Sequence, residues 1–152
     1  MSNDAKKSSD DSALSLDRQI CHSLYSATNA LVRAYRPLLQ QLDLTYPQYL
    51  VMMSLWQRDS VSISSLVEHT RFDAGTLTPM LQRLQGKGLI DIHRAEDDER
   101  RKIIKVTRKG RALKKSACDV PGQIACTAAM PAADALRLKA LCETLVSNLA
   151  ND

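Results

Sequence analysis

Apolar residues recur at the three- and four-residue spacing of a helix face along most of this chain, and the pattern changes only between Leu89 and Thr107. The runs Leu89–Arg94 and Lys102–Thr107 are β-prone, and the charged segment Ala95–Arg101 separates them. This change of period predicts a β-hairpin with a long polar tip, placed between helices. The order of helices, hairpin and further helices restricts the possible folds more than any other feature.

The predicted helices have recognisable start and stop signals. A broad face of two adjacent apolar stripes runs from Leu16 to Leu42, and Pro37 should bend or break this helix near its end. The next helix starts at Thr45, with Gln48 as its capping-box partner, and runs to about Arg58. The other expected helices are Ile63–Thr70 capped by Ser62, one capped by Asp73 or Thr76 that ends at Gly86–Gly88, one from Thr107 through Lys115 that Pro121–Gly122 interrupts, and one over about Ala132–Leu149.

This element order predicts a mainly α (α+β) fold, a winged helix-turn-helix with N- and C-terminal helices forming a dimerisation domain. A chain of 152 residues is long enough for one domain with a core. We expect a disordered N-terminal arm over residues 1–15, a helical dimerisation region over 16–45 and 108–152, and the winged helix-turn-helix DNA-binding domain over 46–107. Two adjacent apolar stripes are more than one small domain usually covers, which favours a homodimer. A monomer that buries both faces internally is the alternative.

Composition argues against several classes of protein. No apolar run approaches the roughly 20 residues of a membrane helix, and the first 12 residues lack the apolar segment of a secretory signal. We therefore expect a cytoplasmic protein without membrane contact. The four cysteines have no Cys-x-x-Cys spacing and do not cluster with the three histidines. Neither a metal, a cofactor nor a structural disulfide framework is expected.

Positive charge is concentrated on and after the predicted hairpin. Between His93 and Lys115 there are ten Lys and Arg residues against four acidic ones, and this excess of six exceeds the +4 net charge of the whole chain. A basic stretch is often only a solvated face. Beside a candidate recognition helix it favours a polyanion, here double-stranded DNA, and for a dimer a pseudo-palindromic operator.

The helix after Asp73 is the candidate for reading DNA bases. Leu77, Met80, Leu81 and Leu84 share the face expected to pack inward. The opposite side is small and mostly uncharged, which suits insertion into the major groove. The residues expected to contact DNA are Thr76, Thr78, Pro79, Gln82 and Arg83. An ordinary amphipathic helix with a solvated face is the alternative, and Pro79 loses a helical hydrogen bond unless the helix begins near Thr76.

The tip of the hairpin carries Asp98 and Arg100. An arginine at such a tip can enter a minor groove, with the neighbouring aspartate holding its guanidinium. The acidic run Glu96–Glu99 argues against uniform contact of the tip with DNA. Arg100 must therefore project past that run.

Cys21 lies near the start of the first long helix, with Tyr25 one turn later and Tyr35 further along. The helix N-terminus and hydroxyl donors both favour a thiolate, the form that peroxide oxidises to sulfenic acid. From the residues alone, a buried structural cysteine is the more common outcome. An enzyme that pairs Cys21 with His22 is geometrically poor, because neighbours in a helix point about 100° apart.

Several motifs, taken in order, resemble the MarR family of dimeric regulators. They are the run from Asp73 to Leu84, the segment Lys87–Ile90, Asp98-x-Arg100 and Thr107-x-x-Gly110. The segments Leu44–Tyr49 and Gln19–Tyr25 are similar, more narrowly, to the organic hydroperoxide resistance repressors of that family. The resemblance covers about residues 16–149.

The resemblance also implies a sensor site. Cys21 matches the sensing cysteine of these repressors, and tyrosines at the places of Tyr35 and Tyr46, contributed across the dimer, hydrogen-bond to it. Tyr25 is a further candidate for this role.

In the two-cysteine type of these repressors, a cysteine just beyond the fifth helix resolves the sulfenic acid as an intersubunit disulfide. Cys126 matches that position, and Cys118 is its nearest rival. Cys142, within an apolar helix stripe, is expected in the core.

The expected function is that of a homodimeric transcriptional repressor, not an enzyme, which releases its operator when organic hydroperoxides oxidise Cys21. A MarR-type regulator gated by a small aromatic ligand is one alternative. A thiol peroxidase-like enzyme is the alternative from another class.

Overall fold

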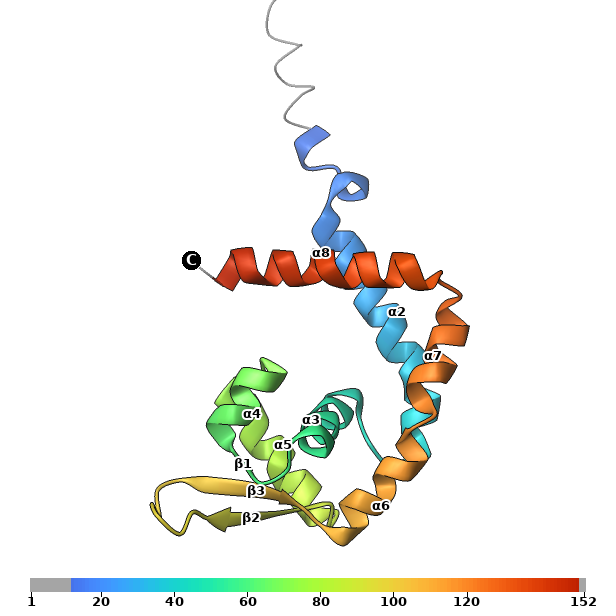
Figure 1. The fold of residues 1–152 in the computed structure, drawn as a ribbon. Coiled ribbons are helices and arrows are strands. Elements are labelled where there is room, and N and C mark those ends of the chain that lie inside the picture. Colours follow the sequence, from blue (N-terminus) through green and yellow to red (C-terminus); the bar gives the residue numbers. More distant parts are fainter. Residues whose placement is uncertain (1–11, 151–152) are drawn as a thin grey trace, which may run out of the picture.

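The computed structural model describes residues 12–150 as a chain of helices with one small sheet (Figure 1). Most of the arm predicted over residues 1–15 lies outside these residues. The elements, in chain order, are η1 (Leu16–Arg18), α2 (Ile20–Gln40), α3 (Tyr46–Gln57), β1 (Val61–Ser62), α4 (Ile63–Thr70), α5 (Ala74–Gly86), β2 (Ile90–Arg94), β3 (Lys102–Val106), α6 (Arg108–Ala117), α7 (Val120–Ala128) and α8 (Ala132–Ala150).

Side-chain caps set the starts of the central helices, as the sequence predicts. Thr45 and Gln48 form the reciprocal capping box at the start of α3, with bonds of 3.4 and 3.2 Å. Ser62 and Thr107 cap α4 and α6. Of the two candidates for α5, Asp73 is the cap, and its carboxylate accepts from the backbone N–H of Thr76.

The sheet is antiparallel with strand order β1-β3-β2, so the hairpin of β2 and β3 has a third, two-residue strand at one edge. Ile104 of β3 pairs with Val61 on one side and with Ile92 on the other. The hairpin was predicted, whereas β1 was not, because two residues before a capped helix carry no alternation.

The core lies where α3, α4, α5 and the sheet meet the C-terminal end of α2. Leu39 is the one buried residue of α2. The largest fully buried side chains are Tyr49, Leu39, Met52, Leu55, Leu66, Leu77, Leu81, Leu84, Ile90, Ile104 and Val51. This core holds the helix-turn-helix and the hairpin together as one body.

α2 continues through Pro37 and ends three residues later, at Gln40, so Pro37 lies near the helix end as expected. One predicted boundary is wrong. The interruption expected at Pro121–Gly122 lies earlier, at Cys118–Asp119, and Pro121 stands in the first turn of α7. A proline is tolerated there because the N–H groups of a first turn have no partner within the helix.

The N-terminal half of α2 and all of α8 leave large apolar side chains exposed. α8 crosses α2 and runs out over α4 (Figure 1). The most exposed of these side chains are Ile20, Tyr25, Leu136, Leu141 and Leu149, at 60–71%, and Leu16 of η1 is 60% exposed. Within residues 12–150, no helix combines the length and apolarity needed to cross a membrane.

Candidate functional site

The candidate recognition helix α5 has the two faces that the sequence predicts. Leu77, Leu81 and Leu84 are buried, and Met80 is half-buried against them. The five residues expected to contact DNA are all exposed: Thr76, Thr78, Pro79, Gln82 and Arg83. One face of α5 is therefore anchored in the core and the other is free.

Internal hydrogen bonds already engage both threonine hydroxyls of this face. Thr76 Oγ1 donates to Asp73 Oδ2 at 2.7 Å, and Thr78 Oγ1 donates to the Ala74 carbonyl at 2.9 Å. The bonds from Thr76 hold the pKa of Asp73 below its usual value, so the cap stays ionised. Each hydroxyl oxygen still has lone pairs that can accept a hydrogen bond.

Pro79 stands inside α5, which begins at Ala74 and not near Thr76. Because proline has no N–H, the Gly75 carbonyl one turn earlier receives no helical bond from it. The sequence predicts that this bond is spared only if the helix begins near Thr76. Because α5 begins two residues earlier, at Ala74, the helical hydrogen bond is lost.

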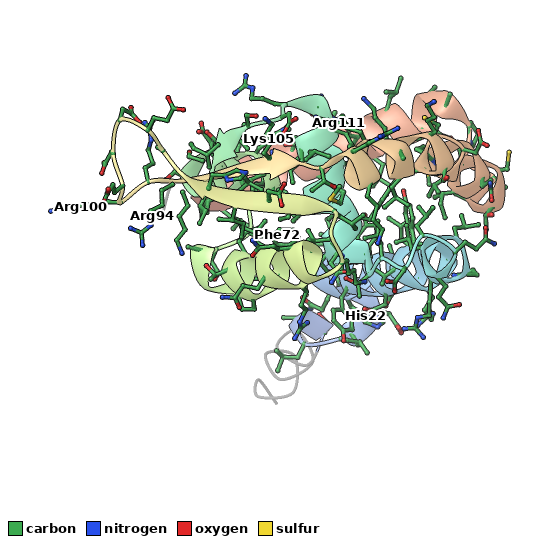
Figure 2. The ribbon with its side chains drawn as sticks, turned by 90° about the horizontal axis from the view of Figure 1, so that it is seen from below. His22, Phe72, Arg94, Arg100, Lys105 and Arg111 are labelled. Carbon is green, nitrogen blue, oxygen red and sulfur yellow. The ribbon has the colours of Figure 1, made fainter. Side chains whose placement is uncertain are left out.

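At the wing tip, Asp98 does not hold the guanidinium of Arg100. Its Oδ1 accepts instead from the backbone N–H of Arg100 at 2.9 Å, which shapes the turn. The neighbouring Arg101 is engaged, with its guanidinium 3.0 Å from both oxygens of Asp97. Arg100 extends from the end of the hairpin (Figure 2) and has no ion pair within the described residues.

A groove of about 260 Å³ lies between α5 and the wing. Its lining includes Thr78, Gln82 and Gln85 from α5, and Arg94 and Lys102 from the two strands. Arg94 and Lys102 are register partners in the hairpin, so two cations stand side by side at its outer end. Gln85 was not singled out from the sequence, whereas Arg94 and Lys102 are two of the ten cations counted between His93 and Lys115.

A cluster of three tyrosines joins α2 to α3. The Tyr35 ring lies 4.8 Å from that of Tyr46 and 5.8 Å from that of Tyr49, measured between centroids. Burial, followed by the nearby Tyr46 and Tyr49, raises the pKa of Tyr35 to about 12. Burial also raises the pKa of Tyr46 and of Tyr49. The cluster is thus neutral and offers O–H donors at physiological pH.

Cys21 is the second residue of α2 and is exposed. Tyr35 follows 14 residues later on the same helix, which at 1.5 Å per residue places it roughly 21 Å away along the axis. Cys21 therefore cannot reach Tyr35 of its own chain. Tyr25 lies outside the cluster and is 69% exposed.

The other cysteines occupy three different surroundings. Cys126 is exposed near the end of α7, and Cys142 of α8, expected in the core, is only partly buried in the single chain. Cys118 is exposed, and its thiol donates to the Lys114 carbonyl at 3.2 Å. Among the described residues, no group of three His, Cys, Asp or Glu is placed to hold a metal ion.

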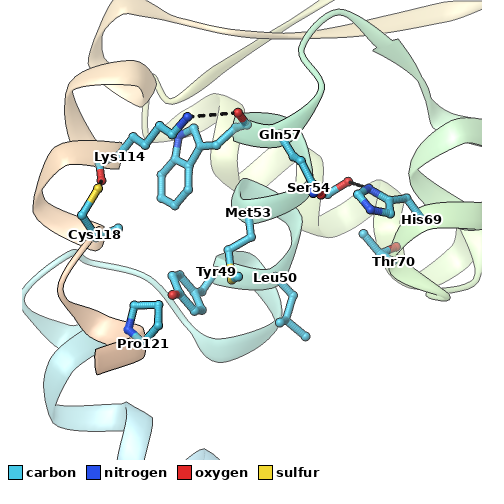
Figure 3. Close-up of a pocket in the computed structure, with 12 residues that line it drawn as sticks. Tyr49, Leu50, Met53, Ser54, Gln57, His69, Thr70, Lys114, Cys118 and Pro121 are labelled. Atoms are coloured by element: carbon cyan, nitrogen blue, oxygen red, sulfur yellow. Dashed lines mark hydrogen bonds between the residues drawn. The ribbon is translucent and has the colours of Figure 1, made fainter. Parts of the chain in front are cut away.

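A cavity of about 520 Å³ lies between α3, the end of α4 and the α6–α7 junction (Figure 3). Its walls include Tyr49, Met53 and Trp56, with Lys114 and Cys118 opposite. At one side Ser54 Oγ is hydrogen-bonded to His69 Nδ1 at 2.7 Å. The cavity is mainly apolar, with a few polar groups at its border.

Comparisons with known proteins place this arrangement in a family. Residues 33–117 match the family of transcriptional regulators described as SarA/Rot. The organic hydroperoxide resistance transcriptional regulator of Bacillus subtilis is 38% identical over 90% of this chain and 92% of its own length.

Solved structures agree with the fold. Reduced AbfR bound to DNA is 30% identical, with a TM-score of 0.73 over 90% of this chain and 93% of that chain. Disulfide-formed AbfR is 28% identical, with a TM-score of 0.60 over 95% and 97%. These relatives are regulators, which confirms the expectation of a DNA-binding winged helix and not of an enzyme. The chain belongs to the MarR family of winged-helix transcriptional regulators and, within it, to the organic hydroperoxide resistance regulators.

Proposed function

We propose that this regulator is a cytoplasmic homodimeric repressor that binds a pseudo-palindromic operator when reduced and releases it when an organic hydroperoxide oxidises Cys21. The observation that carries the proposal is the neutral tyrosine cluster of Tyr35 and Tyr46, which offers O–H donors beside helices with uncovered apolar faces. A thiolate seated on these donors is stabilised and reacts with peroxide.

The sensor is assembled from two chains. Cys21 and Tyr35 are too far apart on one helix, and a second copy packed against α2 supplies the tyrosines in trans. The exposed apolar residues of α2 and α8 are the surface that this copy covers. Large apolar side chains exposed together commonly mark a protein–protein interface. Residues 16–45 and 108–152 form the dimerisation region, and residues 46–107 form the DNA-binding domain.

The chemistry runs in two balanced steps. The Cys21 thiolate attacks the terminal oxygen of the hydroperoxide, the O–O bond breaks, and the alkoxide leaves as an alcohol after taking a proton. Cys21 is then a sulfenic acid. The thiol of Cys126 from the other chain attacks its sulfur, forming a disulfide and releasing water.

Cys126 is preferred over Cys118 as the resolving cysteine. Both thiols are exposed, but Cys118 is bonded to the Lys114 carbonyl beside the cavity, whereas Cys126 stands near the C-terminal end of α7 without such a bond to any described residue. If the Cys126→Ser variant still gives an intersubunit disulfide after peroxide on non-reducing gels, Cys126 is not the resolver.

On DNA, α5 enters the major groove and the wing the minor groove. Gln82 and Arg83 read base edges, while Thr76, Thr78 and Pro79 pack against the groove. Arg100 reaches into the minor groove. Asp98 stabilises the turn at the wing tip by accepting a hydrogen bond from the backbone N–H of Arg100. A disulfide between the dimerisation helices changes the spacing of the two winged domains and so releases the operator.

The test uses an operator duplex that the reduced protein selects from random DNA. Binding is measured before and after one equivalent of cumene hydroperoxide, for the parent, Cys21→Ser and, as a matched control, Cys142→Ser. The parent and Cys142→Ser should release the duplex, and Cys21→Ser should stay bound. Release by Cys21→Ser would contradict the proposal.

The cavity of about 520 Å³ supports a second candidate, gating by a small aromatic ligand. A thermal-shift screen of aromatic acids against the reduced protein tests it, with Met53→Trp filling the cavity as control. Peroxide-independent release of DNA by such an acid, lost in Met53→Trp, would favour this candidate over the redox mechanism.

A further inference from the structure

Lys87 connects the end of the recognition helix to the segment that joins α2 and α3. It is the C-cap residue of α5, and its side chain is only 28% exposed. Its Nζ donates to the carbonyl of Asp43 and lies 3.3 Å from the carboxylate of the same residue. A third acceptor, Gln48 Oε1, lies 3.4 Å away.

The acceptors belong to the segment that positions the tyrosine cluster. Gln48 is 4% exposed and accepts from the backbone N–H of Thr45, completing the cap of α3. Tyr46, the first residue of α3, packs against Tyr35 with the two rings tilted by 46°. Asp43 holds a left-handed backbone with φ 51°, so the turn has a specific shape and presents its carbonyl to Lys87.

The same lysine is fixed on the side of the wing. Its backbone carbonyl accepts from Lys109 Nζ at 2.7 Å, and the Thr107 hydroxyl donates to the carbonyl of the following Gly88. A displacement of residues 43–48 therefore pulls on a residue whose backbone is bound to α5, α6 and the hairpin.

We propose that Lys87 is a positioning residue that transmits the state of the tyrosine cluster to the recognition helix. It touches neither DNA bases nor the sensor thiol. When the Tyr35–Tyr46 contact changes, the start of α3 shifts, and the ammonium carries the shift to the C-terminal end of α5. The inference rests on the proposed function for its signal, but the link itself exists without peroxide.

A double-mutant cycle tests the link. Tyr46→Leu disturbs the cluster while keeping an apolar, half-buried side chain, and Lys87→Met removes the ammonium while keeping the stem. Operator affinity is measured in reductant at one salt concentration for the parent, both single variants and the double variant. We expect Tyr46→Leu to weaken binding about tenfold in the parent and less than about threefold in the Lys87→Met background.

Lys115→Met is the matched control, because it removes the same charge from an exposed lysine of α6 whose side chain is bonded neither to Lys87 nor to residues 43–48. In this background Tyr46→Leu should keep its full effect. If Lys87 only adds charge or stability, Tyr46→Leu weakens binding by the same factor in every background, and the proposal is overturned.

A redox arm separates this proposal from the proposed function. The ratio of operator affinities before and after cumene hydroperoxide should fall in Lys87→Met, while the rate of Cys21 oxidation stays that of the parent. If the oxidised parent protein stays bound to its operator, the redox function is contradicted. The double-mutant cycle in reductant then still tests the role of Lys87. An unchanged affinity ratio in Lys87→Met, with a responsive parent, overturns the link.

Discussion

At the scale of single residues, Gly110 occupies the closest approach between α6 and the hairpin. Its carbonyl accepts from the Trp56 indole at 2.9 Å, and its N–H is capped by Thr107 at 3.0 Å. A Cβ at this position would collide with the Leu89 carbonyl and stand 2.7 Å from Val106 Cγ1. The Thr107-x-x-Gly110 motif is therefore a packing requirement at the junction of wing and helix.

Gly110→Ala is expected to destabilise the fold by about 1–3 kcal/mol, because the clash is with backbone that cannot move aside. Thermal unfolding of the reduced protein measures it. Gly86→Ala is the control, since a Cβ there meets nothing within 4 Å and alanine favours a helix. Equal melting temperatures for the two variants would show that α6 can shift at no cost.

The tyrosine cluster predicts a loss of stability at alkaline pH. The folded-state pKa of Tyr35, about 12, lies above the unfolded value of 10, so its contribution is complete below pH 10 and is lost as pH rises toward 12. The free energy of unfolding, measured with urea across that pH range, should fall less steeply for Tyr35→Phe than for the parent. Tyr25→Phe, at an exposed position, should follow the parent, and identical slopes for all three would contradict the burial of Tyr35.

At the scale of elements, the wing presents two adjacent arginines in different states. Arg101 is paired with Asp97, whereas Arg100 extends from the end of the hairpin (Figure 2). Arg100→Ala should weaken operator binding by about 1–3 kcal/mol, and Arg101→Ala by clearly less, although both remove one charge. Fluorescence anisotropy at constant salt compares them. Equal losses would indicate a general effect of charge and not insertion of Arg100.

How well the sequence predicts each element depends on where its signal lies. Helices α3 to α6 were placed closely because Thr45, Ser62, Asp73 and Thr107 are local capping signals. The α6–α7 break was misplaced because Pro121 fits a first helical turn as well as a stop. The hydrogen bond from the Arg100 backbone N–H to Asp98 was not predicted. The Asp-x-Arg spacing fits a turn closed through the backbone as well as an ion pair between the two side chains.

At the scale of the whole molecule, α8 presents apolar residues that its own chain leaves uncovered. Leu141 and Leu149, two turns apart, are 60% and 67% exposed. Leu141→Lys should convert a dimer into a monomer in sedimentation velocity, and Ser147→Lys, on the polar side of the helix, should stay dimeric. A dimeric Leu141→Lys would remove α8 from the proposed interface.

In the proposed function the sensor site is assembled from two chains, which limits how far the sequence of one chain could predict it. The residues Cys21, Tyr35 and Tyr46 were identified through resemblance, yet helix spacing keeps the thiol from Tyr35 of its own chain. No pattern along one chain states which side chains a second copy brings together. Tyr49 was also missed as a member of the cluster. Its contact with Tyr35 joins two helices of the same chain, and no local spacing in the sequence indicates that contact.

Oxidation of Cys21 in mixed dimers tests this shared site most directly. One chain carries Cys21→Ser and the other carries Tyr35→Phe with Tyr46→Phe, so a site shared between chains leaves one sensor complete. Sulfenic acid at Cys21 is trapped with dimedone and followed by peptide mass spectrometry after cumene hydroperoxide. The account predicts oxidation at the parent's rate, about tenfold faster than in the homodimer of Tyr35→Phe/Tyr46→Phe. A rate in the mixed dimer equal to that of this slow homodimer would contradict it.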